Sequence, residues 1–141
     1  MPDKHLSTQF DSELNAISSR VMELGGLIES QVQQSITALS HFNSDAASAV
    51  IVAETRVNEM EVAIDHEISS IIARRQPAAN DLRLLIAMSK ATANLERAGD
   101  EADKMARMVL SIVQSGKSRL LPAAELRTAS ELAAGLMRKS L

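Results

Sequence analysis

Residues 45–75 read DAASAVIVAETRVNEMEVAIDHEISSIIARR, and this stretch decides the fold. It contains neither glycine nor proline, and apolar residues recur in it every seven positions, at Val50, Val57, Ile64 and Ile71. This period places them in one stripe along an α-helix, whereas a half-buried strand would alternate at every second residue. We therefore predict a helix over 45–75, preceded by the capping cluster 43–45 and ended by Gln76-Pro77.

The stretches on both sides carry the same pattern. A stripe over residues 6–42 runs through Phe10, Leu14, Ile17, Val21, Leu24, Ile28, Val32, Leu39 and Phe42. A third stripe, which stops near Gly116, runs through Leu84, Met88, Ala91, Leu95, Ala98, Ala102, Met105, Val109 and Ile112. Short connections make consecutive helices antiparallel, and helices of this length span about 45 Å. The sequence predicts an all-α fold, an elongated antiparallel three-helix bundle.

The domain organisation follows from these stripes. Residues 1–116 are expected to form the bundle, and residues 117–141 a linker with the start of a fourth helix. The fourth stripe begins after Pro122 and runs through Leu126, Ala129, Leu132 and Leu136. Because no C-cap signal precedes Leu141, we expect this helix to be cut short.

Composition excludes several classes of protein. Of the 141 residues, 45% are hydrophobic, which is enough for one core. Only two residues are aromatic, and the net charge is −3. Nucleic-acid binding is disfavoured, since it needs clustered cations and stacking rings. The chain has no cysteine, which excludes disulfides and fits the cytoplasm. It shows no signal-peptide h-region or apolar run long enough to span a bilayer.

Acidic residues at helical spacing are the candidate site. One polar strip in the second helix holds Glu54, Asn58, Glu61 and Asp65, and another in the third holds Glu96, Asp100, Asp103 and Arg107. Each strip contains a Glu-x-x-x-Asp pair, whose i to i+4 spacing lets two carboxylates share a cation. We expect the acidic groups of the third helix to be well exposed.

The chemistry of this site stays open at this point. All-oxygen ligation suits Mg²⁺, Mn²⁺ or Ca²⁺, carboxylate clusters also take iron, and arginines would neutralise the same charges. Di-iron enzymes use Glu-x-x-His, but the residues three positions after Glu61 and Glu96 are Ile64 and Gly99. The three histidines of the chain are interpreted as surface residues. A merely solvated acidic face is the simplest alternative. No catalytic constellation is evident, so no enzyme is predicted.

Three ordered blocks carry a family resemblance. They are VNEMEVAID at residues 57–65, ARRQP at 73–77 leading to DLRL at 81–84, and LERAGDEADKMAR at 95–107. From about Leu6 onward the chain closely resembles the PhoU family of phosphate-uptake regulators. The resemblance implies two three-helix repeats, of which this chain would hold the first and the opening of the second.

The resemblance also implies a function and a metal site. Family members carry iron or zinc on Glu/Asp-x-x-x-Asp motifs, which match Glu61, Asp65, Glu96 and Asp100, with Asp103 and Glu54 as further ligands. The implied function is phosphate-responsive repression of the phosphate-starvation (Pho) regulon and modulation of high-affinity phosphate transport. It would act by contact with the phosphate ABC transporter ATPase (PstB) and the sensor histidine kinase PhoR.

The chain is also expected to be cytoplasmic and to form a homodimer. It would associate with the membrane only indirectly, through its partners. Two alternatives stay open: a ligand-free structural helical bundle, and a carboxylate-bridged metalloenzyme.

Overall fold

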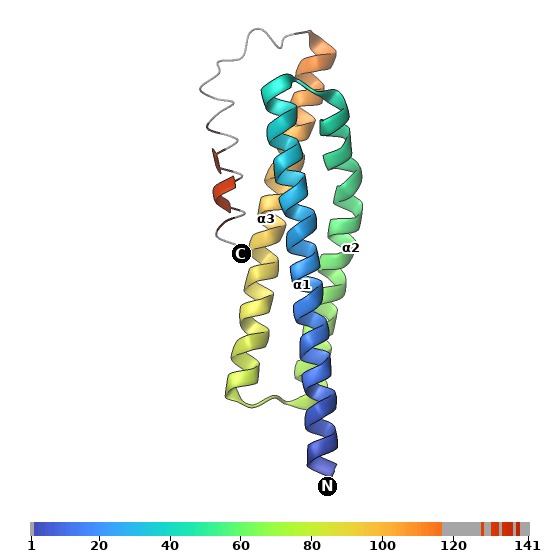
Figure 1. The fold of residues 1–141 in the computed structure, drawn as a ribbon, viewed down its shortest axis with the longest axis vertical. Coiled ribbons are helices and arrows are strands. Elements are labelled where there is room, and N and C mark those ends of the chain that lie inside the picture. The colour runs from blue at the N-terminus through green and yellow to red at the C-terminus, as the bar shows by residue number, and fades with distance from the viewer. Residues whose placement is uncertain (1, 117–127, 129–130, 133, 137, 139–141) are drawn as a thin grey trace.

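The structure, a computed structural model, consists of three long helices. They are α1 (Pro2–His41), α2 (Ser44–Arg75) and α3 (Ala79–Ser115). The structure describes residues 2–116, 128, 131–132, 134–136 and 138, with side chains described from Thr8 onward. In Figure 1 consecutive helices run antiparallel and side by side, and the N-terminal end of α1 projects beyond the other two. The predicted all-α fold is confirmed, and the described residues include no strand.

The helix ends follow the capping signals in the sequence. The Asn43 side chain caps α2 by accepting a hydrogen bond from the Ala46 amide at 3.1 Å. Gln76 closes the same helix in the left-handed conformation at φ 43°, and Gly116 closes α3 at φ 70°. Helix α1 ends one residue earlier than predicted because Phe42 adopts φ 48°, which helical backbone cannot continue.

The core lies along the axis where the three helices meet. Its fully buried side chains include Leu24 and Ile28 of α1, Ile64 of α2, and Leu95 of α3. All three helix pairs pack against one another along their length. Burial on this scale is what stabilises long helices in water, because their own propensities are too weak.

One core position differs from the prediction. Leu84 is 47% exposed, and its neighbour Leu85 is fully buried instead. A heptad stripe drifts by roughly 20° per repeat around a straight helix, so the buried face at the start of α3 is rotated relative to its middle. A single stripe drawn along the helix therefore selected the wrong leucine.

The C-terminal segment is helical where it is described, at residues 128, 131–132, 134–136 and 138. Leu136 is half-buried and packs against the core, whereas Leu132 is 58% exposed. The predicted linker over 117–127, together with Ala129, lies outside the described residues. Among the helices that the structure describes, none is long and apolar enough to cross a membrane.

Candidate functional site

The acidic residues predicted on two helices lie along the contact between those helices. We call this region the acidic seam, and its members are Glu54, Glu61 and Asp65 of α2 with Glu96, Asp100 and Asp103 of α3. Because α2 and α3 are antiparallel, the order of residues is reversed across the seam. Glu54 therefore meets Asp100 and Asp103, and Glu61 meets Glu96.

The Glu61 and Glu96 carboxyl groups face each other across the seam. Partial burial, the neighbouring Glu96 carboxyl group, and the charges of Asp65 and Asp100 together raise the pKa of Glu61 to about 8. Two carboxylates this close cannot both ionise at low cost, so the pair holds a proton at neutral pH.

A second acidic contact lies one turn farther along. Partial burial raises the pKa of Glu54, and the charges of Asp103 and Asp100 add to this, while a hydrogen bond from Gln31 acts in the opposite direction. The pKa of Asp100 is also raised, first by partial burial and then by the charge of Glu96. The described acidic residues of the seam thus outnumber its nearby bases, Lys104 and Arg107 of α3, and no described ion pair crosses from one helix to the other.

The predicted exposure of the α3 carboxylates is only partly right. Asp100 is exposed, but Glu96 is half-buried and the Asp103 side chain is only 18% exposed. These residues lie far from the apolar stripe of their own helix, yet the neighbouring α2 covers that flank. Arg107 donates to one Asp103 carboxylate oxygen at 2.9 Å, while the other oxygen is buried without a partner.

The donor chemistry of the seam fits a hard divalent cation. Every ligand is a carboxylate oxygen, as Mg²⁺, Mn²⁺ and Ca²⁺ prefer, and Asp103 has an acceptor oxygen to spare. The acidic side chains of the two helices nevertheless face each other in pairs, such as Glu61 with Glu96 and Glu54 with Asp100. Among the described residues, no group of three or more His, Cys, Asp or Glu side chains converges closely enough to hold a metal ion. Ligation would require Glu61 to release its proton and the carboxylates to turn toward the ion.

Sequence analysis missed one polar residue of this site, Gln31. It lies on α1, is 2% exposed, and donates from Nε2 to the Glu54 carboxylate at 2.9 Å. A signal was present, because Gln31 falls between Ile28 and Val32, inside the apolar stripe of its helix. A polar residue at a core position predicts a buried hydrogen bond.

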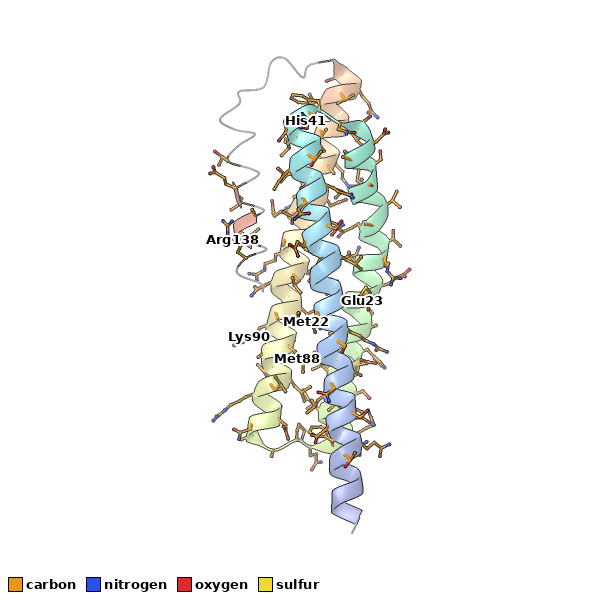
Figure 2. All side chains as sticks on the ribbon, in the orientation of Figure 1. Met22, Glu23, His41, Met88, Lys90 and Arg138 are labelled. Carbon is orange, nitrogen blue, oxygen red and sulfur yellow. The ribbon has the colours of Figure 1, made fainter. Side chains whose placement is uncertain are left out.

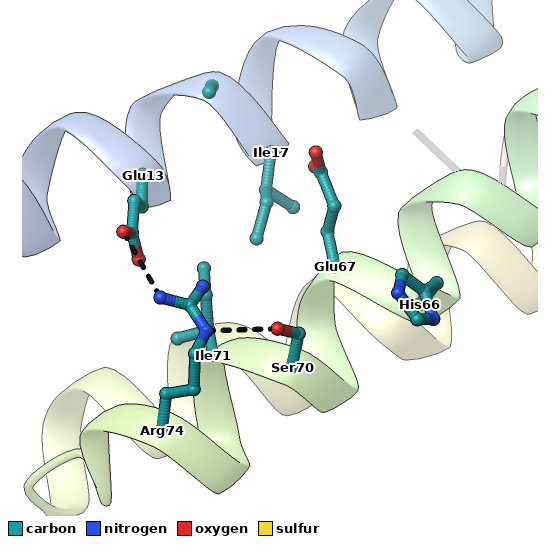
Figure 3. Close-up of a pocket in the computed structure, with 8 residues that line it drawn as sticks. Glu13, Ile17, His66, Glu67, Ser70, Ile71 and Arg74 are labelled. Atoms are coloured by element: carbon teal, nitrogen blue, oxygen red, sulfur yellow. Dashed lines mark hydrogen bonds and ion pairs between the residues drawn. The ribbon is translucent and has the colours of Figure 1, made fainter.

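The opposite side of α2 has a different electrostatic character. We call it the ion-pair seam, and it is formed by Glu13, Arg20 and Glu23 of α1 with Arg56, Glu67, Arg74 and Arg75 of α2. Arg75 donates to Glu13 at 2.9 Å, and this hydrogen bond lowers the pKa of Glu13. Figure 3 shows Arg74 reaching both Glu13 and Ser70 over a pocket of about 310 Å³.

The two histidines whose side chains are described lie outside the acidic seam. His41 is exposed at the end of α1 (Figure 2), and His66 is exposed and lines the pocket of the ion-pair seam. The surface interpretation is confirmed for both, and the side chain of His5 lies outside the described residues. A histidine-assisted di-iron site therefore has no support here.

Comparison with known proteins assigns this geometry to a family. The family model described as the PhoU domain matches residues 21–109, which contain both acidic motifs. The chain belongs to the PhoU family. The predicted resemblance is confirmed, and the acidic seam lies entirely within the PhoU domain.

Individual PhoU relatives agree with this assignment. A phosphate-specific transport system accessory protein PhoU homolog from Burkholderia sp is 43% identical over 142 residues, covering all of this chain and 60% of the relative. The phosphate-specific transport system accessory protein PhoU from Escherichia coli K12 is 50% identical over 108 residues, covering 77% of this chain and 45% of the relative. The chain thus spans about half the length of the curated relatives it matches.

A solved PhoU structure supports the fold directly. The crystal structure of PhoU from Pseudomonas aeruginosa superposes with a TM-score of 0.80 at 40% identity, covering 90% of this chain and 61% of that one. A match this extensive confirms that the three helices form a PhoU-type bundle.

Proposed function

We propose that the chain serves as a phosphate-responsive signalling adaptor, which acts by contact and catalyses no reaction. The observation that carries this proposal is its 43–50% identity to proteins named as accessory to the phosphate-specific transport system. In this role it represses the phosphate-starvation regulon and modulates high-affinity phosphate uptake when phosphate is plentiful. Its partners are the phosphate ABC transporter ATPase (PstB) and the sensor kinase PhoR, and it works as a cytoplasmic homodimer.

The geometry suits recognition by contact. An elongated bundle presents long helical faces, and a partner helix can dock on such a face through a stripe of complementary side chains. The acidic seam has more acidic than basic side chains, and this excess negative charge favours association with a basic partner surface and speeds encounter.

We further propose that the acidic seam binds a divalent cation. Glu61, Asp65, Glu96 and Asp100 would hold it, with Asp103 and Glu54 as additional ligands. All-oxygen ligation favours Mg²⁺, Mn²⁺ or Ca²⁺, and iron or zinc is the expectation from the family. A bound cation would supply the positive charge that this seam lacks and would link α2 to α3.

Binding measurements test the contact function. We expect the tagged chain to bind the purified transporter ATPase or the cytoplasmic part of the kinase in interferometry. Glu96→Lys reverses a charge on the acidic seam and should weaken binding. Glu29→Lys changes an exposed residue of α1 outside that seam and serves as its control. No association with either partner would contradict the proposal.

Elemental analysis tests the cation site. Protein purified without a chelating column should contain metal, and Glu61→Ala and Asp100→Ala should each lower its content. Glu59→Ala removes an exposed carboxylate from the same helix but not from the seam, and should leave the content unchanged. Equal metal content in all variants would contradict the assignment.

A ligand-free bundle is the second candidate, and one observation favours it. The raised pKa of Glu61, about 8, keeps a proton on this carboxyl group at neutral pH, which reduces the repulsion from Glu96 without a cation. Metal-free protein that still binds both partners would identify this alternative.

A further inference from the structure

The pocket of the ion-pair seam is lined by both hydrogen-bond donors and acceptors. Its volume of about 310 Å³ is small for a ligand pocket, and residues of α1 and α2 form its two sides. The buried side chains of Ile17 and Ile71 belong to its apolar lining. A small polar ligand suits such a pocket better than a large apolar one. The polar lining consists of Glu13, His66, Glu67, Ser70 and Arg74.

The donors of the pocket belong to α2. Arg74 Nε donates to Ser70 Oγ at 3.0 Å, and Arg74 Nη1 lies 3.6 Å from Glu13 Oε1 (Figure 3). A guanidinium carries five N–H donors, and the Arg74 side chain is 53% exposed, so donors remain for a ligand. Ser70 is the acceptor in its bond with Arg74, so its own hydroxyl proton is also available.

The charges around the pocket favour an anion over a cation. Glu13 pairs with Arg75 at 2.9 Å, and Glu67 pairs with Arg20. Each glutamate that lines the pocket therefore has a base of its own, and Arg74 is a third base. Three arginines around two glutamates leave one positive charge in excess, which attracts an anion.

The two glutamates restrict which anion fits. Glu13 and Glu67 each have a second carboxylate oxygen that is buried and without a partner among the described residues. Buried acceptors are normally satisfied, and an O–H group of a ligand would satisfy one of them. Hydrogen phosphate carries an O–H group at neutral pH, whereas sulfate carries none and would only be repelled. The lining therefore suits a protonated oxyanion.

We propose that this pocket binds inorganic phosphate in a protonated form. The ion accepts hydrogen bonds from Arg74 and Ser70, and it donates its own to a glutamate of the lining. Bonds between a guanidinium and a phosphate oxygen are charge-assisted and therefore strong. This inference rests on the phosphate-responsive role proposed above, for which it names a ligand and a place. Because the pocket joins α1 to α2, bound phosphate would link these two helices.

Calorimetry of the chain with inorganic phosphate, and separately with sulfate, tests this site at pH 7. Arg74→Gln removes the surplus charge, and Ser70→Ala is the second variant in case the first does not fold. Arg56→Gln is the matched control, because Arg56 is an exposed arginine of the same helix that pairs with Glu23 at 3.3 Å but does not line this pocket. Circular dichroism verifies that each variant is helical.

We expect the phosphate dissociation constant to rise about tenfold or more in Arg74→Gln, because a hydrogen bond to a charged group is lost. It should stay unchanged in Arg56→Gln. Wild-type chain should bind sulfate at least about tenfold more weakly than phosphate, since a site that hydrogen-bonds a ligand O–H rejects an analogue without it. Phosphate should also shift the side-chain N–H signal of Arg74 in nuclear magnetic resonance spectra.

Four results would overturn the inference. Equal affinity for sulfate and phosphate would remove the role of the glutamates, and an equal loss in Arg56→Gln would remove the placement in this pocket. A phosphoserine peptide that binds more tightly than inorganic phosphate would identify a phosphorylated protein as the ligand instead. The last is a wild-type chain that binds no phosphate, which leaves contact with the ATPase or the kinase to its own binding test.

Discussion

Helix α2 packs against its two neighbours through seams of contrasting charge. On the ion-pair seam, acids and bases alternate between helices, as in the pair of Arg56 with Glu23 at 3.3 Å. On the acidic seam, carboxylates face carboxylates, and the nearby bases Lys104 and Arg107 belong to α3 itself. Among the described residues, no ion pair joins α2 to α3.

The two sides of α2 therefore have different roles: the ion-pair seam contributes to folding, and the acidic seam is the candidate functional site. Every acid of the ion-pair seam faces a base, so folding explains this arrangement of charges. The acidic seam concentrates like charges and raised pKa values, an arrangement that opposes folding and is typical of sites that meet a ligand. It persists because the apolar core beneath it holds α2 and α3 together.

The largest expected effect follows from that dependence on the core. Leu95→Ala should lower the free energy of unfolding by about 2–5 kcal/mol, since it removes a fully buried side chain that packs α3 into the bundle. Urea unfolding followed by circular dichroism measures the change. Leu84→Ala, at an exposed position of the same helix, should shift it by less than about 0.5 kcal/mol. Equal losses in both variants would show that the core does not hold this seam.

The pH dependence of stability should have opposite signs for the two seams. The folded-state pKa of Glu61, about 8, lies above its ordinary value of 4.5, so the folded chain binds an extra proton between these values. Stability is then lost as pH rises through this window. The pKa of Glu13 is lowered by Arg75, so its contribution is lost as pH falls below about 4.5.

Glu61→Gln isolates the acidic seam in this experiment. It should flatten the decline toward alkaline pH and raise the stability at pH 9 by on the order of 1 kcal/mol, because solvent screens part of the repulsion. Thermal melts in chelator-treated buffers from pH 4 to pH 9 provide the measurement. A wild-type chain whose melting temperature rises between pH 5 and pH 8 would contradict the predicted sign.

The fold was accessible from sequence because each of its determinants is local. The heptad stripe of Val57 and Ile64, the Asn43 cap and the Gln76-Pro77 break each act within a few residues, so pattern alone placed three helices. The error at Leu84 arose because a heptad stripe drifts around a straight helix, and the amount of drift depends on how the helices pack in the assembled bundle.

The site was less accessible because its decisive contacts join different helices. Spacing gave the two acidic pairs, but only the antiparallel packing showed Glu61 against Glu96 and Glu54 against Asp100. The half-burial of Asp103 depends on cover from α2, and the hydrogen bond from Gln31 to Glu54 depends on an approach from α1. No pattern within a single helix contains that information.

Two glycines test whether the acidic seam shapes the backbone near it. A Cβ on Gly26, inside α1, would meet nothing within 4 Å, so Gly26→Ala should stabilise the chain by about 1 kcal/mol through helix propensity. Gly99→Ala should lose most of that gain, because its Cβ would press on Gln31 Oε1 at 3.2 Å. Thermal melts compare the two. Equal stabilisation would mean that Gly99 is not reserved for the Gln31 amide.

The smallest effect should come from the ion-pair seam itself. Glu23 and Arg56 are 56% and 64% exposed, so a double-mutant cycle with alanine should give a favourable coupling of only about 0.2–1 kcal/mol. The coupling should shrink in 1 M salt, where the Debye length is about 3 Å. At pH 9, where Glu61 is ionised, the same cycle on Glu61 and Asp100 should have the opposite sign, since the two carboxylates repel, and salt should reduce the coupling too. Couplings of the same sign at both sites would remove the electrostatic distinction between the seams.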